Sequence, residues 1–130
     1  MLQNLAVLVT ALLFGGMVLY SFGFAAFVFT ALPADLAGKT IRKAFPHFYV
    51  FVMLTALVAA LLLWRIDPTS MILTGVVALT TLPTRQILMP AINHATDAGQ
   101  TTRFKWLHTL SVFISLVHMA LAAIVLIRLT

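Results

Sequence analysis

The chain contains no cysteine among its 130 residues and has few charged residues. Without thiols there can be no disulfide, no thiolate nucleophile and no cysteine-based metal or iron–sulfur site. Charged residues make up 8% of the chain and hydrophobic residues 62%, whereas about a quarter of a soluble domain is charged. So little charge cannot cover a soluble surface. The composition predicts one integral membrane domain in a lipid bilayer.

Acidic residues are the scarcest class, with Asp35, Asp67 and Asp97 the only three. They are far apart in the sequence, outside the most apolar runs, so they form no carboxylate pair for general acid–base chemistry. No glycine-rich phosphate loop, nucleophile elbow or metalloprotease signature is present. These features favour a non-catalytic protein.

Long apolar runs dominate the remaining sequence. The predicted spans are, approximately, residues 5–32, 46–64, 69–89 and 104–128. Each is close to the roughly 20 residues that a helix needs to cross a bilayer. The short turn at Asp67-Pro68 makes the second and third spans a hairpin. The fold prediction is therefore all-α, an up-down-up-down four-helix bundle in the membrane, with part of the 33–46 connection as a short interfacial helix.

Basic residues cluster at the ends of these runs, where they suit lipid headgroups rather than a nucleic acid. Six of the eight fall in the connections after the first and third spans: Lys39, Arg42, Lys43, Arg85, Arg103 and Lys105. Arg65 and Arg128 lie at the opposite end. This asymmetry predicts a cytoplasmic position for the six and non-cytoplasmic termini. The predicted localisation is a bacterial inner membrane.

Small residues recur every seven positions in the first span, at Gly16, Gly23 and Thr30. Such spacing lets the backbone of a neighbouring helix approach closely. Gly16 and Gly23 are therefore predicted to form a packing interface, either with another copy of this chain or with a larger membrane complex.

Histidines are the candidate ligands. His108 and His118 share a polar stripe with Ser111 and Ser115 on the fourth span, while the expected topology puts His47 at the same end as His108. Imidazoles on different helices can hold a b-type haem. His108 with His47 or His118 is thus one candidate ligand set.

Arg85 has two readings. It can pair with a haem propionate, another anionic ligand or Asp97, or it can extend to the headgroups and help to orient the protein.

Other roles for the histidines stay open. A membrane histidine can also pack and hydrogen-bond to a neighbouring helix, and a transition metal is a third occupant. The five methionines within the spans read as flexible filler rather than as metal ligands. An oligomeric conduit for a small solute or metal is a further alternative.

Short motifs over nearly the whole chain resemble the transmembrane protein 205-like family. The matching segments are Phe14-Gly-Gly-Met17, the run from Ala37 to Tyr49, Arg85 with Pro90 and Asn93, and Phe104 with Leu107-His108 and Ser111. The resemblance implies a small four-span membrane domain of unknown function and offers no catalytic residues. A looser similarity, through Leu107-His108, is to copper-resistance D-like membrane proteins. The leading functional prediction is an accessory or assembly subunit of a membrane complex.

Overall fold

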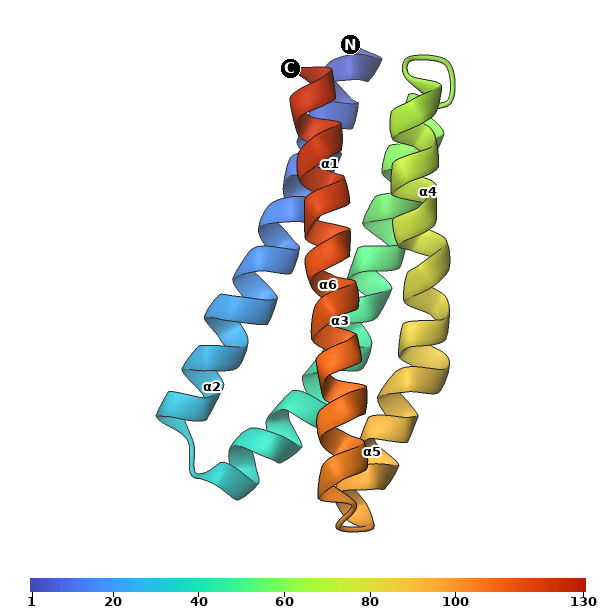
Figure 1. Cartoon of the computed structure of the whole chain (residues 1–130). Helices are drawn as coiled ribbons and strands as arrows, with labels where there is room; N and C mark the ends of the chain where they lie inside the picture. Colours follow the sequence, from blue (N-terminus) through green and yellow to red (C-terminus); the bar gives the residue numbers. More distant parts are fainter.

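The computed structural model describes all residues, 1–130, as four antiparallel helical rods with both termini at one end (Figure 1). The first rod consists of α1 (Leu2–Val18), the π-helix η1 (Leu19–Phe24) and α2 (Ala25–Ala31). The second rod is α3 (Ala34–Leu63). The third consists of α4 (Pro68–Pro83), the π-helix η2 (Thr84–Leu88) and α5 (Met89–Asp97), and the fourth is α6 (Thr101–Leu129). The predicted all-α four-helix bundle is confirmed.

Prolines and one glycine set the ends of the rods. Leu32 is extended because the residue before a proline disfavours the helical region, and α3 starts directly after Pro33. Pro68 opens α4, where its missing N–H would be unpaired in any case. Gly99, with φ +68°, makes the turn between α5 and α6, a conformation that a side chain would strain.

Two rods extend beyond the spans predicted from the sequence. The helix α3 begins at Ala34 and passes through Pro46 without a break, so residues 34–45 form no separate interfacial helix. The third rod continues past Pro83 to Asp97. The wide π-turn of η2 lies between Pro83 and Pro90, where a proline ring would crowd the carbonyl one turn earlier in a regular helix.

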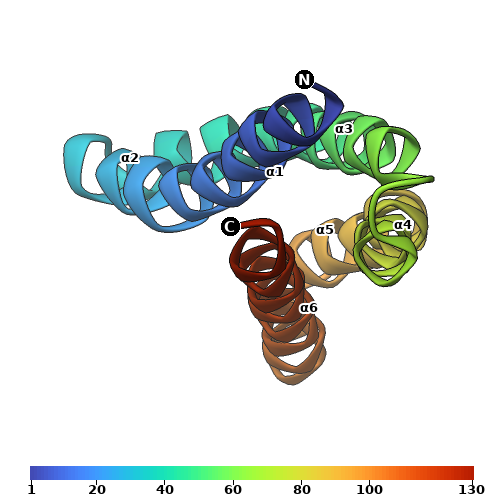
Figure 2. The same ribbon diagram turned by 90° about the horizontal axis from the view of Figure 1, so that it is seen from above.

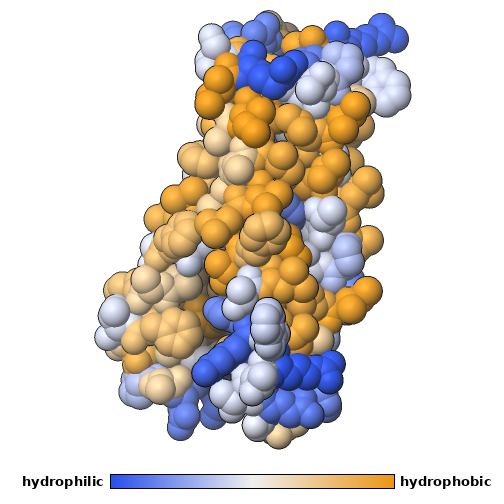
Figure 3. Space-filling model, in the orientation of Figure 1, coloured by the Kyte–Doolittle hydropathy of each residue, from blue (hydrophilic) through white to orange (hydrophobic).

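All four rods are long and apolar enough to cross a membrane. Seen from above, the first rod and α3 lie along one side, with α4–α5 and α6 on the other (Figure 2). Apolar side chains cover the middle of the outer surface and polar ones gather at the two ends (Figure 3). This pattern matches a lipid environment, in which the outer face of a bundle is apolar.

The core is made of two clusters at different heights. Near the termini, Ala6 packs with Val125 and Leu129 of α6 and with Leu63 of α3. The larger cluster lies further along and joins all four rods: Leu13, Met17, Phe48, Tyr49, Val52, Ala56, Val77, Met119 and Ala122. Buried alanines on α3 and α6 let helix backbones approach closely.

Candidate functional site: an open cleft at the basic end

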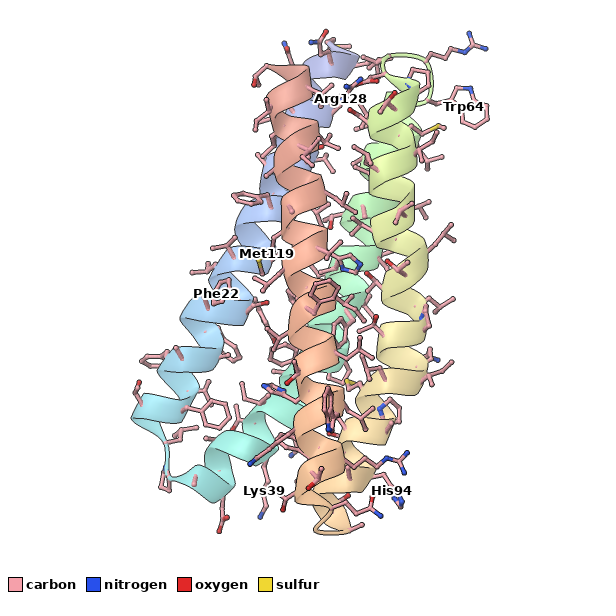
Figure 4. The ribbon with its side chains drawn as sticks, in the orientation of Figure 1. Phe22, Lys39, Trp64, His94, Met119 and Arg128 are labelled. Atoms are coloured by element: carbon pink, nitrogen blue, oxygen red, sulfur yellow. The ribbon has the colours of Figure 1, made fainter.

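A cleft of about 920 Å³ opens between the first rod and α6 at the end away from the termini. Its walls come from η1 and α2, the first half of α3, α5 and the first two thirds of α6. In Figure 4, Lys39 lies at the mouth, while Phe22 and Met119 lie nearer the middle of the molecule. The cleft therefore runs from the polar end into the apolar part of the bundle.

The cleft is open because the first rod leaves α6 after the core cluster. Near the termini the two helices are in contact, since the Gln3 amide donates to the carbonyl oxygen of Leu129 at 3.2 Å and Ala6 is fully buried in the cluster with Val125. Beyond Met17, the turn widens into η1 and α2 diverges from α6 (Figure 1).

An aromatic cluster holds η1 against α3, on the wall of the cleft that lies opposite α6. Tyr20 stacks on Phe48 with ring centroids 4.8 Å apart and meets Phe45 edge-on at 5.5 Å. The Tyr20 hydroxyl donates to the carbonyl oxygen of Ala44 at 2.9 Å. These contacts fix the angle between the two rods, and with it the width of the cleft.

Charged side chains surround the mouth. Arg42 of α3 donates to both carboxylate oxygens of Asp97 at the end of α5, at 2.9 and 3.2 Å. Asp35 and Lys39, on the same side of α3, also line the cleft but take part in neither of the two ion pairs in the chain. The mouth thus offers one free cation and one free anion, a helical turn apart.

Hydroxyl groups lie deeper in the cleft. Ser111 and Ser115 face it from α6 and Ser21 faces it from η1. The Ser21 Oγ is buried without a hydrogen-bond partner, which is costly in an apolar setting.

Only one of the candidate haem ligands lines the cleft. His108 faces it, with its ring stacked on Phe104 at 5.4 Å. His47 is exposed and lies outside the cleft, although Phe45 and Tyr49 on either side of it line the wall. His118 is buried, and its Nε2 lies 2.7 Å from the hydroxyl of Thr80. The three histidines therefore do not share one cavity, and no group of three or more metal-ligating side chains is present.

Arg85 is also in use within the chain. Its Nε donates to the carbonyl oxygen of Pro46 at 3.1 Å, and one terminal nitrogen donates to the Gln86 side chain at 2.6 Å. Asp97, one of the partners considered for Arg85, binds Arg42 instead. Arg85 ties η2 to α3 and does not line the cleft.

The two glycines of the expected packing interface differ in their surroundings. A Cβ at Gly16 would lie 2.5 Å from the Phe51 ring of α3, so Gly16 packs inside this chain. A Cβ at Gly23 would meet only Leu19 of its own helix, at 3.1 Å. The close approach at Gly16 is therefore between α1 and α3.

Sequence reasoning missed most of the cleft. Asp35, Lys39, Arg42 and Phe45 follow one another at intervals of three or four residues, the spacing of one helical face. This spacing is visible in the sequence. It was not identified as one face of a membrane helix, because the residues before Pro46 were predicted to form a separate interfacial segment. Ser21 gives no sequence signal, because its position depends on the wide turn of η1.

At the opposite end, an ion pair fastens the last turn of α6 to the turn between α3 and α4. Arg128 donates to both carboxylate oxygens of Asp67, at 3.0 and 3.1 Å, and the Ser70 hydroxyl donates to the same carboxylate at 2.6 Å. The Arg128 guanidinium, and after it the Ser70 hydroxyl, holds the pKa of Asp67 well below its usual value. Asp67 therefore stabilises the fold while it is ionised.

The Asp67 contact is expected to make stability depend on acid pH. A carboxylate whose pKa is lowered by folding contributes fully above its unfolded pKa, about 4, and loses this contribution as the pH falls towards the lower folded value. Thermal unfolding in detergent at pH 7 and pH 3 should show a smaller loss of Tm for Asp67→Asn than for the natural chain. Asp35→Asn, at a carboxylate outside the ion pairs, should keep the natural profile. Equal pH profiles for all three proteins would contradict the role of Asp67.

Comparison with known proteins identifies a family. Residues 8–101 match the model of a domain of unknown function, DUF4149. The match covers the first three rods except for the first six residues of α1, and it ends where α6 begins. It does not bear on the likeness to transmembrane protein 205-like proteins, which stays a prediction. No curated protein and no solved structure matches the chain. The chain belongs to the DUF4149 family, whose domain has no known function.

Proposed function

We propose that this small integral membrane protein is a non-catalytic accessory subunit that binds another membrane component in the cleft. The cleft itself carries the proposal, because it combines a charged mouth, apolar walls and hydroxyl-bearing side chains. Small side chains on both walls, such as Ala25 and Ser115, leave room for a close neighbour. Arg42 is paired with Asp97 and Arg128 with Asp67, and Arg85 binds Pro46 and Gln86. Lys39 takes part in neither of these ion pairs and is available to an occupant of the cleft.

The proposed orientation puts the mouth of the cleft at the cytoplasmic face of a bacterial inner membrane. Six of the eight basic residues lie in the halves of the helical rods nearest this end, and segments rich in lysine and arginine next to the ends of membrane spans stay in the cytoplasm. Both termini are then on the non-cytoplasmic side.

Site-specific photocrosslinking tests the proposal. A photoreactive phenylalanine analogue would replace Phe22 or Phe29, which line the cleft and already carry a phenyl ring, and Leu12 or Ala120 outside it. The protein would be extracted into detergent and freed of loosely bound lipid before irradiation. We expect a defined adduct by mass spectrometry from the two cleft positions and none from the outer positions. The absence of any adduct in the cleft, or equal yields at all four positions, would contradict the proposal.

Haem binding is the second candidate, supported by the one imidazole that faces the cleft. The His108 ring forms no hydrogen bond within the chain, so a nitrogen is free to ligate. A Soret band after expression with excess haem, lost in His108→Ala, would replace the accessory proposal.

A conduit for solute or metal would require further copies of the chain, because contacts between α1 and α6 close the cleft near the termini.

A further inference from the structure

We infer that the occupant of the cleft is one glycerophospholipid from the leaflet at the basic end, with its phosphate at Lys39. This inference depends on the proposed function, since it names the component that the cleft binds. It follows from three properties of the cleft: its length, the charges at its mouth and the chemistry of its walls.

The cleft has the length of one leaflet. On the first rod its lining extends from Ser21 to Phe29, about 12 Å of helix at 1.5 Å per residue. The hydrocarbon core of a bilayer is about 30 Å thick, so this is close to one half of it. Further along, Ala6 and Val125 are fully buried where α1 meets α6. A transmembrane helix would have to leave the cleft there, whereas an acyl chain ends there.

The charges at the mouth fit a headgroup with a phosphate and an amine. Lys39 is the free cation, and Arg42 lies one turn further on, already bonded to Asp97. Asp35 is the free anion one turn before Lys39. A phosphate at Lys39 leaves the amine of phosphatidylethanolamine within reach of Asp35, because a helical turn is about 5.4 Å long.

The walls fit an acyl chain below an ester. Phe22 and Phe29 on one side face Leu116 on the other, which gives apolar contact to a hydrocarbon chain. His108 and Ser115 line the same cleft, and neither the His108 ring nor the Ser115 hydroxyl has a hydrogen-bond partner in the chain. The His108 ring can donate to an ester carbonyl oxygen, which accepts only, while Ser115 lies seven residues, about 10 Å of helix, further into the cleft.

Native mass spectrometry of the full chain tests the inference, with palmitoyl-oleoyl phosphatidylethanolamine added to the detergent micelles. We expect one bound lipid per chain. Lys39→Ala should lower the affinity about fivefold, the effect of one basic residue at a membrane surface, and Lys43→Ala, outside the cleft on the same helix, should not. Ser115→Trp should abolish binding by filling the cleft, while Ala120→Trp on the exposed face of α6 should leave it intact.

Each outcome of these measurements supports or overturns the bound lipid. Retention of the lipid by Ser115→Trp, or equal effects of Lys39→Ala and Lys43→Ala, would overturn the inference. Ala25→Leu on the opposite wall gives a second filling variant if Ser115→Trp does not elute as a single species. If the natural chain retains no lipid and the cleft crosslinks yield a protein adduct, the lipid is wrong but the binding function stands. If the crosslinks also yield nothing, both fail.

Discussion

Replacing Gly16 with leucine is expected to destabilise the bundle by roughly 1 to 3 kcal/mol, the cost of forcing extra volume into a packed core. A Cβ alone would lie 2.5 Å and 2.7 Å from the Cε1 and Cζ atoms of Phe51. The ring cannot move freely, because Phe51 packs against the larger core cluster. Unfolding titrations in mixed detergent micelles would measure the change in free energy.

Gly15 provides a matched control one residue earlier. A Cβ there would have no neighbour within 4 Å, so Gly15→Leu should not lower the free energy of unfolding and should raise it by up to about 1 kcal/mol through helix propensity. Phe51→Ala in the Gly16→Leu background should restore part of the loss, since it removes the ring that the new side chain meets. Equal losses for the two glycine variants would mean that Gly16 is not at a close contact.

Shortening Leu13 to alanine is the second change with a large expected effect. Leu13 is 0% exposed and belongs to the core cluster that joins all four rods. Core leucines in soluble proteins lose about 2 to 5 kcal/mol on this change. In lipid the solvent is as apolar as the side chain, so only lost packing contacts count. We expect a loss near the lower limit, about 2 kcal/mol, in the same titrations.

Leu12 is the natural comparison for Leu13, because it has the same side chain and is 55% exposed on the outer face of α1. Lipid chains can fill the space that Leu12→Ala vacates, so its free energy of unfolding should be close to that of the natural chain. A loss at Leu12 as large as that at Leu13 would show that the outer face of α1 is packed against another protein chain.

The fold followed from the sequence because it depends on properties that are local to each segment. Four long apolar runs with few charges leave no alternative to membrane helices. The turn residues Pro33, Pro68 and Gly99 lie where the structure ends one rod and starts the next. Short connections then make neighbouring rods antiparallel.

The site was harder to predict because it depends on how the rods diverge. Within α6, the polar stripe predicted from the sequence grouped His108, Ser111 and Ser115, which all line the cleft. It could not show that His118, on the same stripe, would meet Thr80 of α4 at 2.7 Å. Arg42 and Asp97 are 55 residues apart in sequence, so their pairing required the three-dimensional arrangement.

The π-helix η1 also explains why the seven-residue spacing of small residues did not mark a single face. Gly16 and Gly23 would lie nearly in line on a regular helix, but Gly23 lies inside η1 (Leu19–Phe24), where the turns are wider. The backbone N–H of Ala25 bonds to the carbonyl of Tyr20, five residues earlier. The spacing is therefore out of phase after Leu19, and no feature of residues 19–24 announces this in the sequence.

The wide turn of η1 separates the part of the first rod that packs in the core from the part that lines the cleft. One extra residue per turn rotates everything after it by about 100° relative to a regular helix, so the wall from Ala25 to Phe29 is aimed independently of the core residues Leu13 and Met17. Insertion or deletion of one residue in η1 would therefore rotate the wall from Ala25 to Phe29 without changing the packing of Leu13 and Met17.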